Sequence, residues 1–539
     1  MSRPEEAPRG GPWLAALSGL LLALSYPHAD LGPLALLALV PLLLALGRGE
    51  GGVGAGFRLG LLCGVVFFAA LLYWIPVVMV TYGGLSWALG ILAFSPLVLY
   101  LALYTALFGS LVAAARRQVG PMALLAAPVL WTGLELIRGR ALTGFPWGLL
   151  GYTQHRNLGL LQAAAVGGIY AVSFLVMACN AGVALLLPGG RKAPAARRAG
   201  AALLLGVAAA QAGGVLALPR RPADGSAGAV PVAAIQGNVP QGVKWTPGSG
   251  PRIVTDLVRL TRQAAAAGAR LVVWPESASP YAFNRPRPAA TPGEGPAIEP
   301  DAAYTGAVTG LARGLGIAII AGSVDYRVEG DGLVAYNSAF AVAPDGTLGP
   351  SYDKVHLVPF GEYVPLRGLL FFVDRLVRGA ISDFAPGTRL DPLPTPLGPA
   401  ATFICYEAIL PEVVRAIARR GAVVLVNLTN DGWYGKSAAP SQHLAMAVAR
   451  AVENRRFMVR AANTGNSAVI DPYGRVLART RLEEQAVLIA AVAPRRDATF
   501  YARHGDWLAW CCAILTALHA ALRATFARRG DPAAAQGPC

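Results

Sequence analysis

The sequence predicts a multi-span α-helical membrane bundle joined to an α/β domain, and three observations support this prediction. Of the 539 residues, 55% are hydrophobic and only 14% are charged, whereas about a quarter of the residues of a soluble protein are charged. No charged residue lies between Arg58 and Arg116, a stretch far longer than the roughly 20 residues with which one helix crosses a bilayer. In residues 220–504, by contrast, short β-branched runs alternate with amphipathic helical stretches, which is typical of an α/β domain.

The apolar runs divide the chain into three parts. Residues 1–219 are predicted to form a bundle of seven transmembrane helices, residues 220–504 the α/β domain, and residues 505–539 an eighth helix with a cytoplasmic tail. No small-residue cleavage site follows the first run, so we expect an uncleaved helix there rather than a signal peptide. The eight runs cover residues 13–27, 31–47, the two halves of 58–116 on either side of Thr81 to Gly84, 120–136, 160–187, 199–218 and 507–522.

Arginine and lysine residues beside these runs orient the bundle, because cytoplasmic loops carry an excess of them. With the N-terminus inside, thirteen lie in the inner segments and three in the short outer segments, namely Arg138, Arg140 and Arg156. Both termini are then cytoplasmic, and residues 220–504 lie on the periplasmic side of a bacterial inner membrane. Because this topology accounts for the net charge of +16, we expect no nucleic-acid partner.

The α/β domain is predicted to be a mixed sheet layered with helices. Two insertions interrupt it. Residues 277–300 are rich in proline and alanine and are expected to form a mobile loop, and residues 366–381 form an amphipathic arm that could lie on a bilayer surface. The predicted strands are residues 230–236, 270–274, 317–323, 338–342, 401–405, 423–428, 458–462 and 467–471, and the predicted helices are residues 252–267, 301–315, 412–419 and 441–453.

Three positions of this domain place a reactive side chain beside a strand end. Glu276 follows a buried strand, Lys354 precedes a loop rich in proline and glycine, and Cys405 ends the strand 401–405. A partly desolvated carboxylate can accept a thiol proton, and an adjacent ammonium favours the thiolate and an oxyanion. Taken singly, each residue also fits an ordinary role, as a surface glutamate, a solvated lysine and a packed cysteine. Since Cys405 is the only cysteine between residues 218 and 504, no disulfide framework can be drawn for the domain.

Taken together, the three contexts resemble the nitrilase superfamily. They read Trp-Pro-Glu276, Asp-Lys354-Val-His-Leu-Val-Pro-Phe-Gly-Glu362 and Ile-Cys405-Tyr-Glu407. The resemblance implies an α-β-β-α sandwich for residues 220–504. With the eight predicted spans, the chain resembles the apolipoprotein N-acyltransferase family over nearly its whole length. Supporting motifs begin at Gly144, Gly151, Gln236, Thr429, Gln442 and Glu453.

The resemblance implies a catalytic triad and a set of residues around it. Glu276 is the base, Cys405 is the nucleophile, and Lys354 stabilises the thiolate and the oxyanion. It also implies that Trp245 contacts the substrate. Supporting roles are implied for Glu362, Tyr406 and Glu407.

The same resemblance implies the substrates. A phospholipid such as phosphatidylethanolamine donates its sn-1 acyl chain to the thiol, and the resulting thioester acylates the α-amino group of the S-diacylglyceryl cysteine of an apolipoprotein. Neither a metal nor a cofactor is implied. We expect a membrane-embedded monomer, because both substrates are anchored in lipid.

Two other functions fit the residues. A membrane-tethered amidase would use the same triad to hydrolyse a small amide, and it would release acid or ammonia without transfer to an amine. A transporter or scaffold would only bind with its outer domain, but ion-coupled transport usually requires charged or broken helices in the membrane. The uncharged runs 59–115, 160–187 and 199–218 argue against such transport.

Two weaker signals stay open at this point. His356 or His443 could pair with Cys405 as in papain-like enzymes, although Glu276 and Lys354 already fill the roles of base and cation. Glu135, Arg138 and Arg140 cluster near the outer end of the fifth run. They fit either a contact with a lipid headgroup or an interfacial ion cluster.

Overall fold

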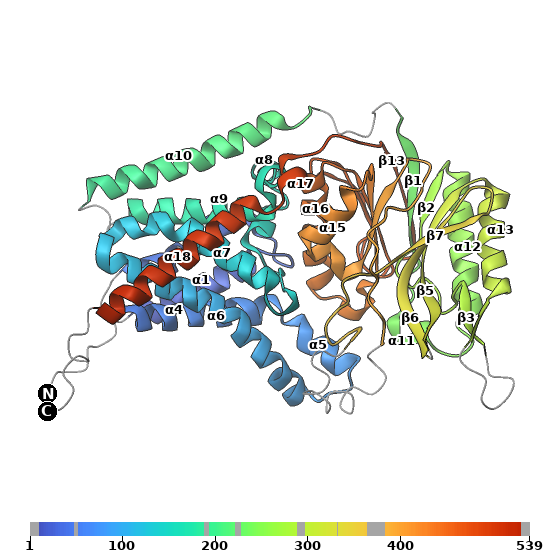
Figure 1. Cartoon of the computed structure of the whole chain (residues 1–539), viewed down its shortest axis with the longest axis horizontal. Coiled ribbons are helices and arrows are strands. Elements are labelled where there is room, and N and C mark those ends of the chain that lie inside the picture. The colour runs from blue at the N-terminus through green and yellow to red at the C-terminus, as the bar shows by residue number, and fades with distance from the viewer. Residues whose placement is uncertain are drawn as a thin grey trace. The chain divides into compact units, whose positions relative to one another are not determined.

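The computed structural model describes residues 10–47, 52–187, 193–220, 228–287, 297–330, 332–363 and 383–529, with side chains described to residue 523. It divides into two compact units (Figure 1). The helical unit comprises Met1–Tyr73, Ile91–Leu218 and His504–Cys539, and the sheet unit comprises Trp74–Gly90 and Pro219–Arg503. The chain therefore leaves the helical unit twice, first for a short segment and then for the sheet unit proper.

The apolar runs fold as helices, as their composition predicts. Among the described residues, four stretches are long and apolar enough to cross a membrane: Gly52–Leu71, Trp87–Thr143, Ala164–Leu186 and Pro194–Ala217. The second is 57 residues long and contains both the fourth and the fifth predicted spans. Shorter apolar helices occupy Gly11–Leu24, Gly32–Gly47 and Trp507–Arg523. The α-helices are α1 (Gly11–Leu24), α2 (Ala35–Ala38), α3 (Val40–Gly47), α4 (Gly52–Leu71), α6 (Trp87–Val119), α7 (Ala127–Arg140), α8 (Leu158–Leu161), α9 (Ala164–Leu186), α10 (Pro194–Ala217) and α18 (Trp507–Arg529).

Glycines allow α4 and α6 to pack closely. Gly56, Gly60 and Gly64 are four residues apart and so share one face of α4. A Cβ added to Gly60 would lie 2.8 Å from the Cα of Ala106, and one added to Gly64 would lie 2.8 Å from the Cα of Ala102. Small residues at this spacing let helix backbones approach each other in a membrane, where packing drives association.

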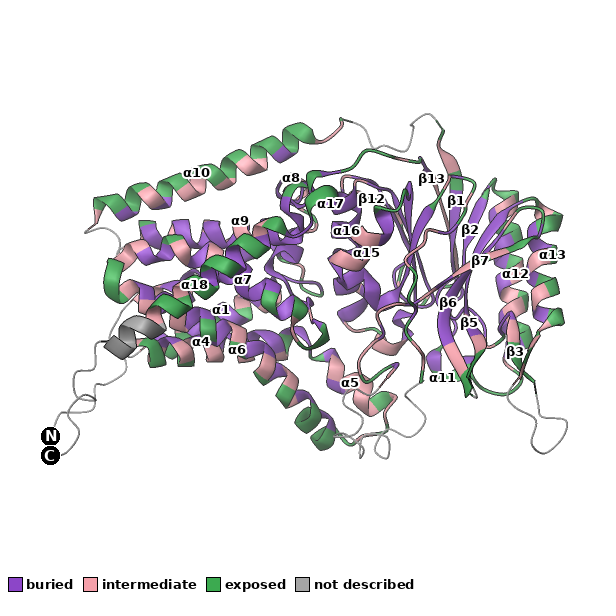
Figure 2. Ribbon diagram, in the orientation of Figure 1, coloured by how far each residue is buried: buried purple, intermediate pink, exposed green. Residues whose placement is uncertain are grey.

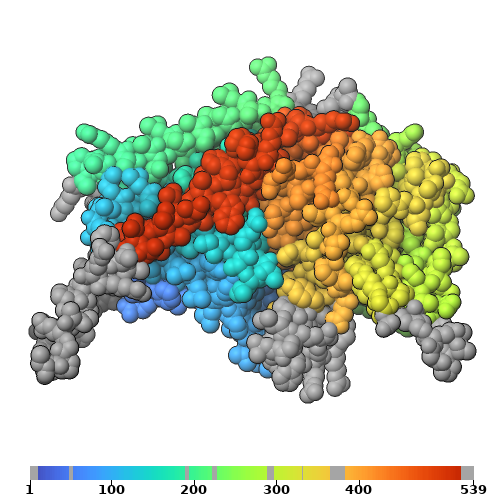
Figure 3. All heavy atoms as spheres, in the orientation of Figure 1, coloured from blue at the N-terminus to red at the C-terminus, as the bar shows by residue number. Residues whose placement is uncertain are grey.

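Apolar side chains are exposed on several helices of this unit. Leu205 and Leu216 of α10 are 70% and 85% exposed, and Ile514 and Leu518 of α18 are more than half exposed. In Figure 2, α10 is coloured mostly as exposed or intermediate, and Figure 3 shows α18 along the surface of the unit. Soluble monomers rarely expose extended apolar surface, so these helices are those of a membrane protein.

Two facing sheets form the centre of the sheet unit (Figure 1). In spatial order, the first contains β13 (Ala486–Val492), β1 (Val230–Gln236), β2 (Leu271–Val273), β5 (Ala318–Glu329), β6 (Gly332–Val342) and β7 (Leu348–Asp353). The second contains β12 (Val476–Arg479), β11 (Ala468–Ile470), β10 (Met458–Ala462), β9 (Val424–Thr429) and β8 (Ala400–Ile404).

Helices cover the outer face of each sheet. Helices α12 (Gly250–Ala266) and α13 (Ala302–Leu315) lie against the first sheet, and α15 (Pro411–Ala418) and α16 (Ala439–Asn454) against the second (Figure 1). The interior strands β2, β9 and β10 and the edge strand β8 are buried along their whole length, as expected for strands covered on both faces. The predicted α-β-β-α sandwich is confirmed.

The carboxyl ends of the parallel strands lie together at one edge of each sheet. β1, β2 and β5 are parallel, and β7 runs in the same direction because it is antiparallel to β6, which is antiparallel to β5. β8, β9 and β10 are likewise parallel. Ligands of α/β sheets commonly bind outside the carboxyl ends of such strands.

The two predicted insertions have different outcomes. The ends of residues 277–300 form a hairpin in which β3 (Asn284–Arg287) pairs antiparallel with β4 (Ala297–Pro300), so this part of the expected loop is regular structure. The predicted arm at residues 366–381 lies outside the described residues and stays a prediction.

Trp74–Gly90 belongs to the sheet unit, although it falls in the range predicted to be bundle. It begins with the short helix α5 (Trp74–Thr81). The Tyr82 hydroxyl donates to the carbonyl of Gly432 at 2.8 Å, and its ring lies edge-on to Trp433 at 5.3 Å. These aromatic contacts fix the segment against the turn that follows β9.

Candidate active site

The carboxyl ends of three strands bring Glu276, Lys354 and Cys405 together. The chain runs from β2 towards Glu276, from β7 into Lys354 and from β8 into Cys405. Lys354 Nζ lies 3.6 Å from Oε1 of Glu276, and the Cys405 thiol interacts electrostatically with both groups. None of the three is more than 7% exposed, so their charges interact more strongly than they would in water.

Glu276 is held by two hydrogen-bond donors. Oε1 accepts a bond from Asn337 Nδ2 at 2.7 Å, and Oε2 accepts one from the backbone N–H of Asn430 at 2.8 Å. Gly322 leaves room for this turn, because a Cβ there would lie 2.8 Å from the Cα of Glu276. Since a carboxylate oxygen accepts at two lone-pair sites, Glu276 can take up a proton while these bonds persist.

Lys354 is a buried cation between two carboxylates. Its Nζ lies 2.8 Å from Oε2 and 2.9 Å from Oε1 of Glu362, and Asn337 Nδ2 bridges Glu362 and Glu276. Burial alone would lower the pKa of Lys354, but the carboxylates of Glu362 and Glu276 raise it above its ordinary value. Lys354 is therefore an ammonium group that can stabilise negative charge nearby.

Cys405 occupies a strained position at the start of a short 3₁₀ turn, Cys405–Ile409. Its φ of 51° is in the left-handed region that non-glycine residues seldom adopt, and such residues cluster at functional sites. Burial and the charge of Glu276 raise the pKa of the thiol, whereas Lys354 lowers it. The thiol is thus protonated, and a thiolate would form at Cys405 only if a base took the proton.

Glu407 ties the Cys405 turn to the loop that carries Lys354. Its Oε2 accepts from the N–H of Ile404 at 2.7 Å, and its Oε1 accepts from the N–H groups of Val355 and His356 at 2.8 and 3.1 Å. The side chain is fully buried. Glu407 therefore fixes the turn at Cys405 relative to the loop that carries Lys354, and its supporting role in a reaction stays a prediction.

The two remaining predicted residues differ in exposure. Tyr406 is buried and stacks on His356, with ring centroids 6.0 Å apart. Trp245 is 51% exposed and follows Lys244, whose Nζ lies 3.4 Å from the carbonyl oxygen of Glu276. The Trp245 ring centroid lies 5.9 Å from Lys244 Nζ, and an exposed indole at this position is available for contact with a substrate.

Two family models match the chain. That of the carbon-nitrogen hydrolases matches residues 231–499, and that of the apolipoprotein N-acyltransferase N-terminal domain matches residues 18–182. An apolipoprotein N-acyltransferase of Geobacter metallireducens is 42% identical over 520 residues, covering 96% of this chain and 95% of that protein. The chain belongs to the apolipoprotein N-acyltransferase family. Another apolipoprotein N-acyltransferase, of Azotobacter vinelandii, is 37% identical over 540 residues, covering 98% of this chain and 97% of that protein.

Family membership confirms the resemblance predicted from the sequence, both to the apolipoprotein N-acyltransferases and to the carbon-nitrogen hydrolases of the nitrilase superfamily. Among solved structures, the crystal structure of an amidase from Nesterenkonia sp. is similar, with 21% identity and a TM-score of 0.36. It covers 52% of this chain and 96% of the amidase chain.

Sequence reasoning missed two polar residues that contact Glu276 in the candidate site, namely Asn337 and Lys244. Asn337 lies inside β6 next to Ser338, where polar residues in a strand carry no functional signal of their own. Lys244 is fully buried beside Glu276, and a signal for it was present, since lysine occurs only at positions 192, 244, 354 and 436.

Lys244 gives a prediction for stability. Burial lowers the pKa of Lys244 to about 8, although Glu276 acts in the opposite direction. In the unfolded chain, Lys244 has its ordinary pKa near 10.5. Between pH 8 and 10.5 the unfolded chain therefore binds more protons than the folded protein, so the wild type gains stability as the pH rises through this window. Replacing Lys244 by methionine should stabilise the protein at pH 7 by up to about 3 kcal/mol.

The measurement is thermal unfolding of both proteins in detergent at pH 7 and near pH 10. The advantage of Lys244→Met should shrink as the pH rises. A constant difference, or a variant less stable at both values, would contradict the cost assigned to this buried ammonium.

The two histidines do not form a papain-like pair with the thiol. His443 Nε2 lies 3.0 Å from the backbone carbonyl oxygen of Cys405. His356 stacks on Tyr406, and burial, together with the charge of Lys354, lowers the pKa of its ring. His443 contacts Cys405 through the main chain.

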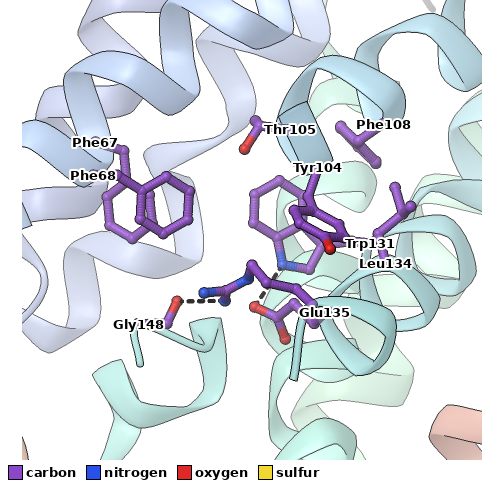
Figure 4. A pocket seen from close by; sticks show the side chains of 10 residues that line it. Phe67, Phe68, Tyr104, Thr105, Phe108, Trp131, Leu134, Glu135 and Gly148 are labelled. Carbon is purple, nitrogen blue, oxygen red and sulfur yellow. Dashed lines mark hydrogen bonds between the residues drawn. The ribbon is translucent and has the colours of Figure 1, made fainter. Parts of the chain in front are cut away.

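The polar cluster near the outer end of the fifth predicted span binds the protein's own backbone. Glu135 Oε1 accepts from Trp131 Nε1 at 3.0 Å and from the N–H of Leu150 at 2.7 Å. Arg138 donates to the carbonyls of Trp147 and Gly148 at 2.7 and 3.2 Å. Figure 4 shows Glu135 and Trp131 on one side of a pocket lined largely by aromatic rings.

The third member of that cluster has a separate partner. Arg140 pairs with Asp506 at 2.6 Å, so it joins α7 to the residue preceding α18. These contacts favour an ion cluster over a dedicated headgroup site.

Proposed function

We propose that this member of the apolipoprotein N-acyltransferase family transfers an acyl chain from a phospholipid, such as phosphatidylethanolamine, to the α-amino group of the S-diacylglyceryl cysteine that begins an apolipoprotein. The observation that carries the proposal is 42% identity to an apolipoprotein N-acyltransferase over 96% of the chain. The buried cluster of Glu276, Lys354 and Cys405 supplies the three groups that such a transfer needs.

In the first half-reaction, Glu276 takes the proton from the Cys405 thiol, and the thiolate attacks the ester carbonyl of the phospholipid. Lys354 and the backbone N–H of Tyr406 stabilise the oxyanion of the tetrahedral intermediate. When the intermediate collapses, the bond from the carbonyl carbon to the glycerol oxygen breaks. Glu276 returns the proton to that oxygen, leaving a thioester on Cys405 and a lysophospholipid.

In the second half-reaction, the α-amino group attacks the thioester. Glu276 accepts a proton from the nitrogen as the new carbon–nitrogen bond forms, and the same donors stabilise the second oxyanion. Collapse breaks the carbon–sulfur bond, and the thiolate regains the proton from Glu276. The products are an N-acylated cysteine and the free enzyme, with no metal or cofactor consumed.

Burial and apolar surface around the site support transfer rather than hydrolysis. The acylated thiol would sit where Cys405 is only 5% exposed, which limits attack by water. Two exposed aromatic rings flank the catalytic segments: Trp245, and Phe360 in the loop between Lys354 and Glu362. Both offer contact area for an acyl chain. In the proposal, residues 220–504 face the periplasm and residues 1–219 and 505–539 provide the membrane spans, with the monomer as the active form.

The direct test supplies phosphatidylethanolamine labelled in its sn-1 acyl chain together with a diacylated lipopeptide. The account predicts acylated lipopeptide and lysophospholipid in equal amounts by mass spectrometry, and neither product with Cys405→Ala. Cys511→Ala is the matched control, because Cys511 is exposed on α18 and should retain activity. Release of free fatty acid without lipopeptide acylation would instead indicate a hydrolase.

A further inference from the structure

A buried polar network lies behind the nucleophile and plays no part in the proposed proton transfers. His443 on α16 places Nε2 3.0 Å from the carbonyl oxygen of Cys405 and Nδ1 3.0 Å from Oδ1 of Asp431. Arg460 on β10 donates to Oδ2 of Asp431 at 2.8 Å and lies 3.0 Å from Nδ1 of His443. The side chains of His443, Asp431 and Arg460 have no exposed surface.

The acceptors around the ring fix the position of one proton. A backbone carbonyl can only accept, so the 3.0 Å contact with Cys405 requires a proton on Nε2 of His443. A neutral ring then accepts from Arg460 at Nδ1, and a charged ring donates to Asp431. In both states, Nε2–H donates to the nucleophile's carbonyl.

Asp431 and Arg460 hold this ring in place. Burial would raise the pKa of Asp431, but the charges of Arg460 and His443 lower it to about 2. The carboxylate is thus ionised at any physiological pH and pairs permanently with Arg460. Arg460 is itself bonded to Asn427, whose Nδ2 donates to the carbonyl of Phe403 at 3.1 Å.

Peptide geometry carries the effect of His443 to the reacting atoms. The carbonyl of Cys405 and the N–H of Tyr406 belong to one peptide unit, which is planar and trans, so they point in opposite directions. Fixing the carbonyl therefore also fixes the direction of the N–H. No described residue accepts a hydrogen bond from this N–H, which leaves it available for a substrate oxygen.

We propose that His443 is a positioning residue: by holding the carbonyl of Cys405 from behind, it aims the Tyr406 N–H at the oxyanion that forms during acyl transfer. This inference rests on the proposed function, because it concerns the tetrahedral intermediates of that reaction. The left-handed φ of Cys405 explains why such a restraint is needed, since strained backbone persists only where surrounding contacts hold it.

The test compares two substitutions of His443. Methionine removes the N–H donor and fills the space with an apolar side chain. Glutamine places a side-chain N–H group at about the position of Nε2. Two rates are measured for each protein: acylation of Cys405 by labelled phosphatidylethanolamine in vesicles, and alkylation of Cys405 by iodoacetamide. Alkylation needs the thiolate but forms no oxyanion, so it reports whether the nucleophile and its base are intact.

We expect His443→Met to lower the saturated acylation rate by about 10- to 100-fold, somewhat less than complete loss of one oxyanion donor. Alkylation should change by less than about threefold, and His443→Gln should recover most of the acylation rate. The inference would be overturned if His443→Met acylated Cys405 at the wild-type rate, or if it lost acylation and alkylation equally. It would also be overturned if His443→Gln did not recover the acylation rate. If wild-type Cys405 is alkylated but never acylated, the proposed function fails, and this inference fails with it.

Discussion

Replacing Lys354 by methionine is expected to lower the rate of acyl-enzyme formation by about 10³-fold, because loss of one oxyanion donor alone costs 10²- to 10³-fold and the thiolate loses its cation as well. The same change leaves the carboxylates of Glu276 and Glu362 buried together without the ammonium that lies 3.6 Å from one and 2.8 Å from the other. Breaking a buried ion pair in this way costs about 3–5 kcal/mol. Acylation of Cys405 by labelled phospholipid and thermal unfolding in detergent measure the two effects.

Lys436→Met is the matched control for this experiment. Lys436 pairs with Glu483 at 2.9 Å, but its side chain is 76% exposed, and exposed pairs contribute little to stability. We expect wild-type activity and an unchanged melting temperature from it. If Lys354→Met acylated Cys405 within about tenfold of the wild-type rate, the role assigned to the ammonium would be wrong.

Replacing Glu276 by glutamine should lower the turnover rate by about 10²- to 10⁴-fold, the range for loss of a general acid–base group. Glutamine has nearly the same shape but cannot accept the thiol proton, and burial raises the pKa of the Cys405 thiol, so little thiolate forms without the base. Alkylation of Cys405 by iodoacetamide should therefore fall together with acylation. That joint loss distinguishes Glu276→Gln from His443→Met, which should affect acylation alone.

The control for Glu276→Gln is Glu299→Gln, whose carboxylate pairs with Arg285 at the surface and is 36% exposed. It should leave both rates unchanged. The side-chain NH2 group of a glutamine at position 276 would also face the N–H donor of Asn337 or Asn430. That donor would lose its acceptor, which costs about 1–3 kcal/mol of stability. The variant must therefore be assayed below its own melting temperature. Alkylation at the wild-type rate would mean that another group takes the thiol proton.

The site residues that could be predicted from the sequence are those with a reactive side chain just after a buried strand. Glu276 and Cys405 follow fully buried strands, β2 and β8, and an ionisable group at such a position stands out against its apolar context. The membrane helices were equally predictable, because an uncharged run as long as residues 59–115 is far longer than any helix or strand in the core of a soluble domain needs. Family-specific motifs then assigned roles that the isolated side chains could not.

Other features depend on contacts between distant parts of the chain. Asn337 bridges Glu276 and Glu362 from the middle of β6, and nothing in its neighbours marks it. Glu407 was expected to support the site, but its role as an acceptor for three backbone N–H groups follows only from the folded loop. The outer ends of β5 and β6, residues 324–329 and 332–337, were also missed, and both are more exposed than the inner parts of these strands.

The segment Trp74–Gly90 shows the limit of hydrophobicity as a guide to structure. It contains the end of the third predicted span, the break at Thr81 to Gly84 and the start of the fourth span, which predicts a place in the bundle. In the structure, α5 is only eight residues long, and the aromatic rings at Trp74 and Tyr82 pack on Tyr434 and Trp433 instead. Apolar side chains signal burial but do not specify the surface against which they are buried.

The central claim is that Cys405 carries the acyl group, and intact-protein mass spectrometry tests it most directly. Wild-type protein is incubated with phosphatidylethanolamine in the absence of any lipopeptide. The account predicts a mass increase of one acyl chain, located on the peptide that contains Cys405 and lost when a diacylated lipopeptide or hydroxylamine is added. An adduct that persists in Cys405→Ala, or a wild-type protein that acylates lipopeptide without ever carrying an acyl group, would contradict it.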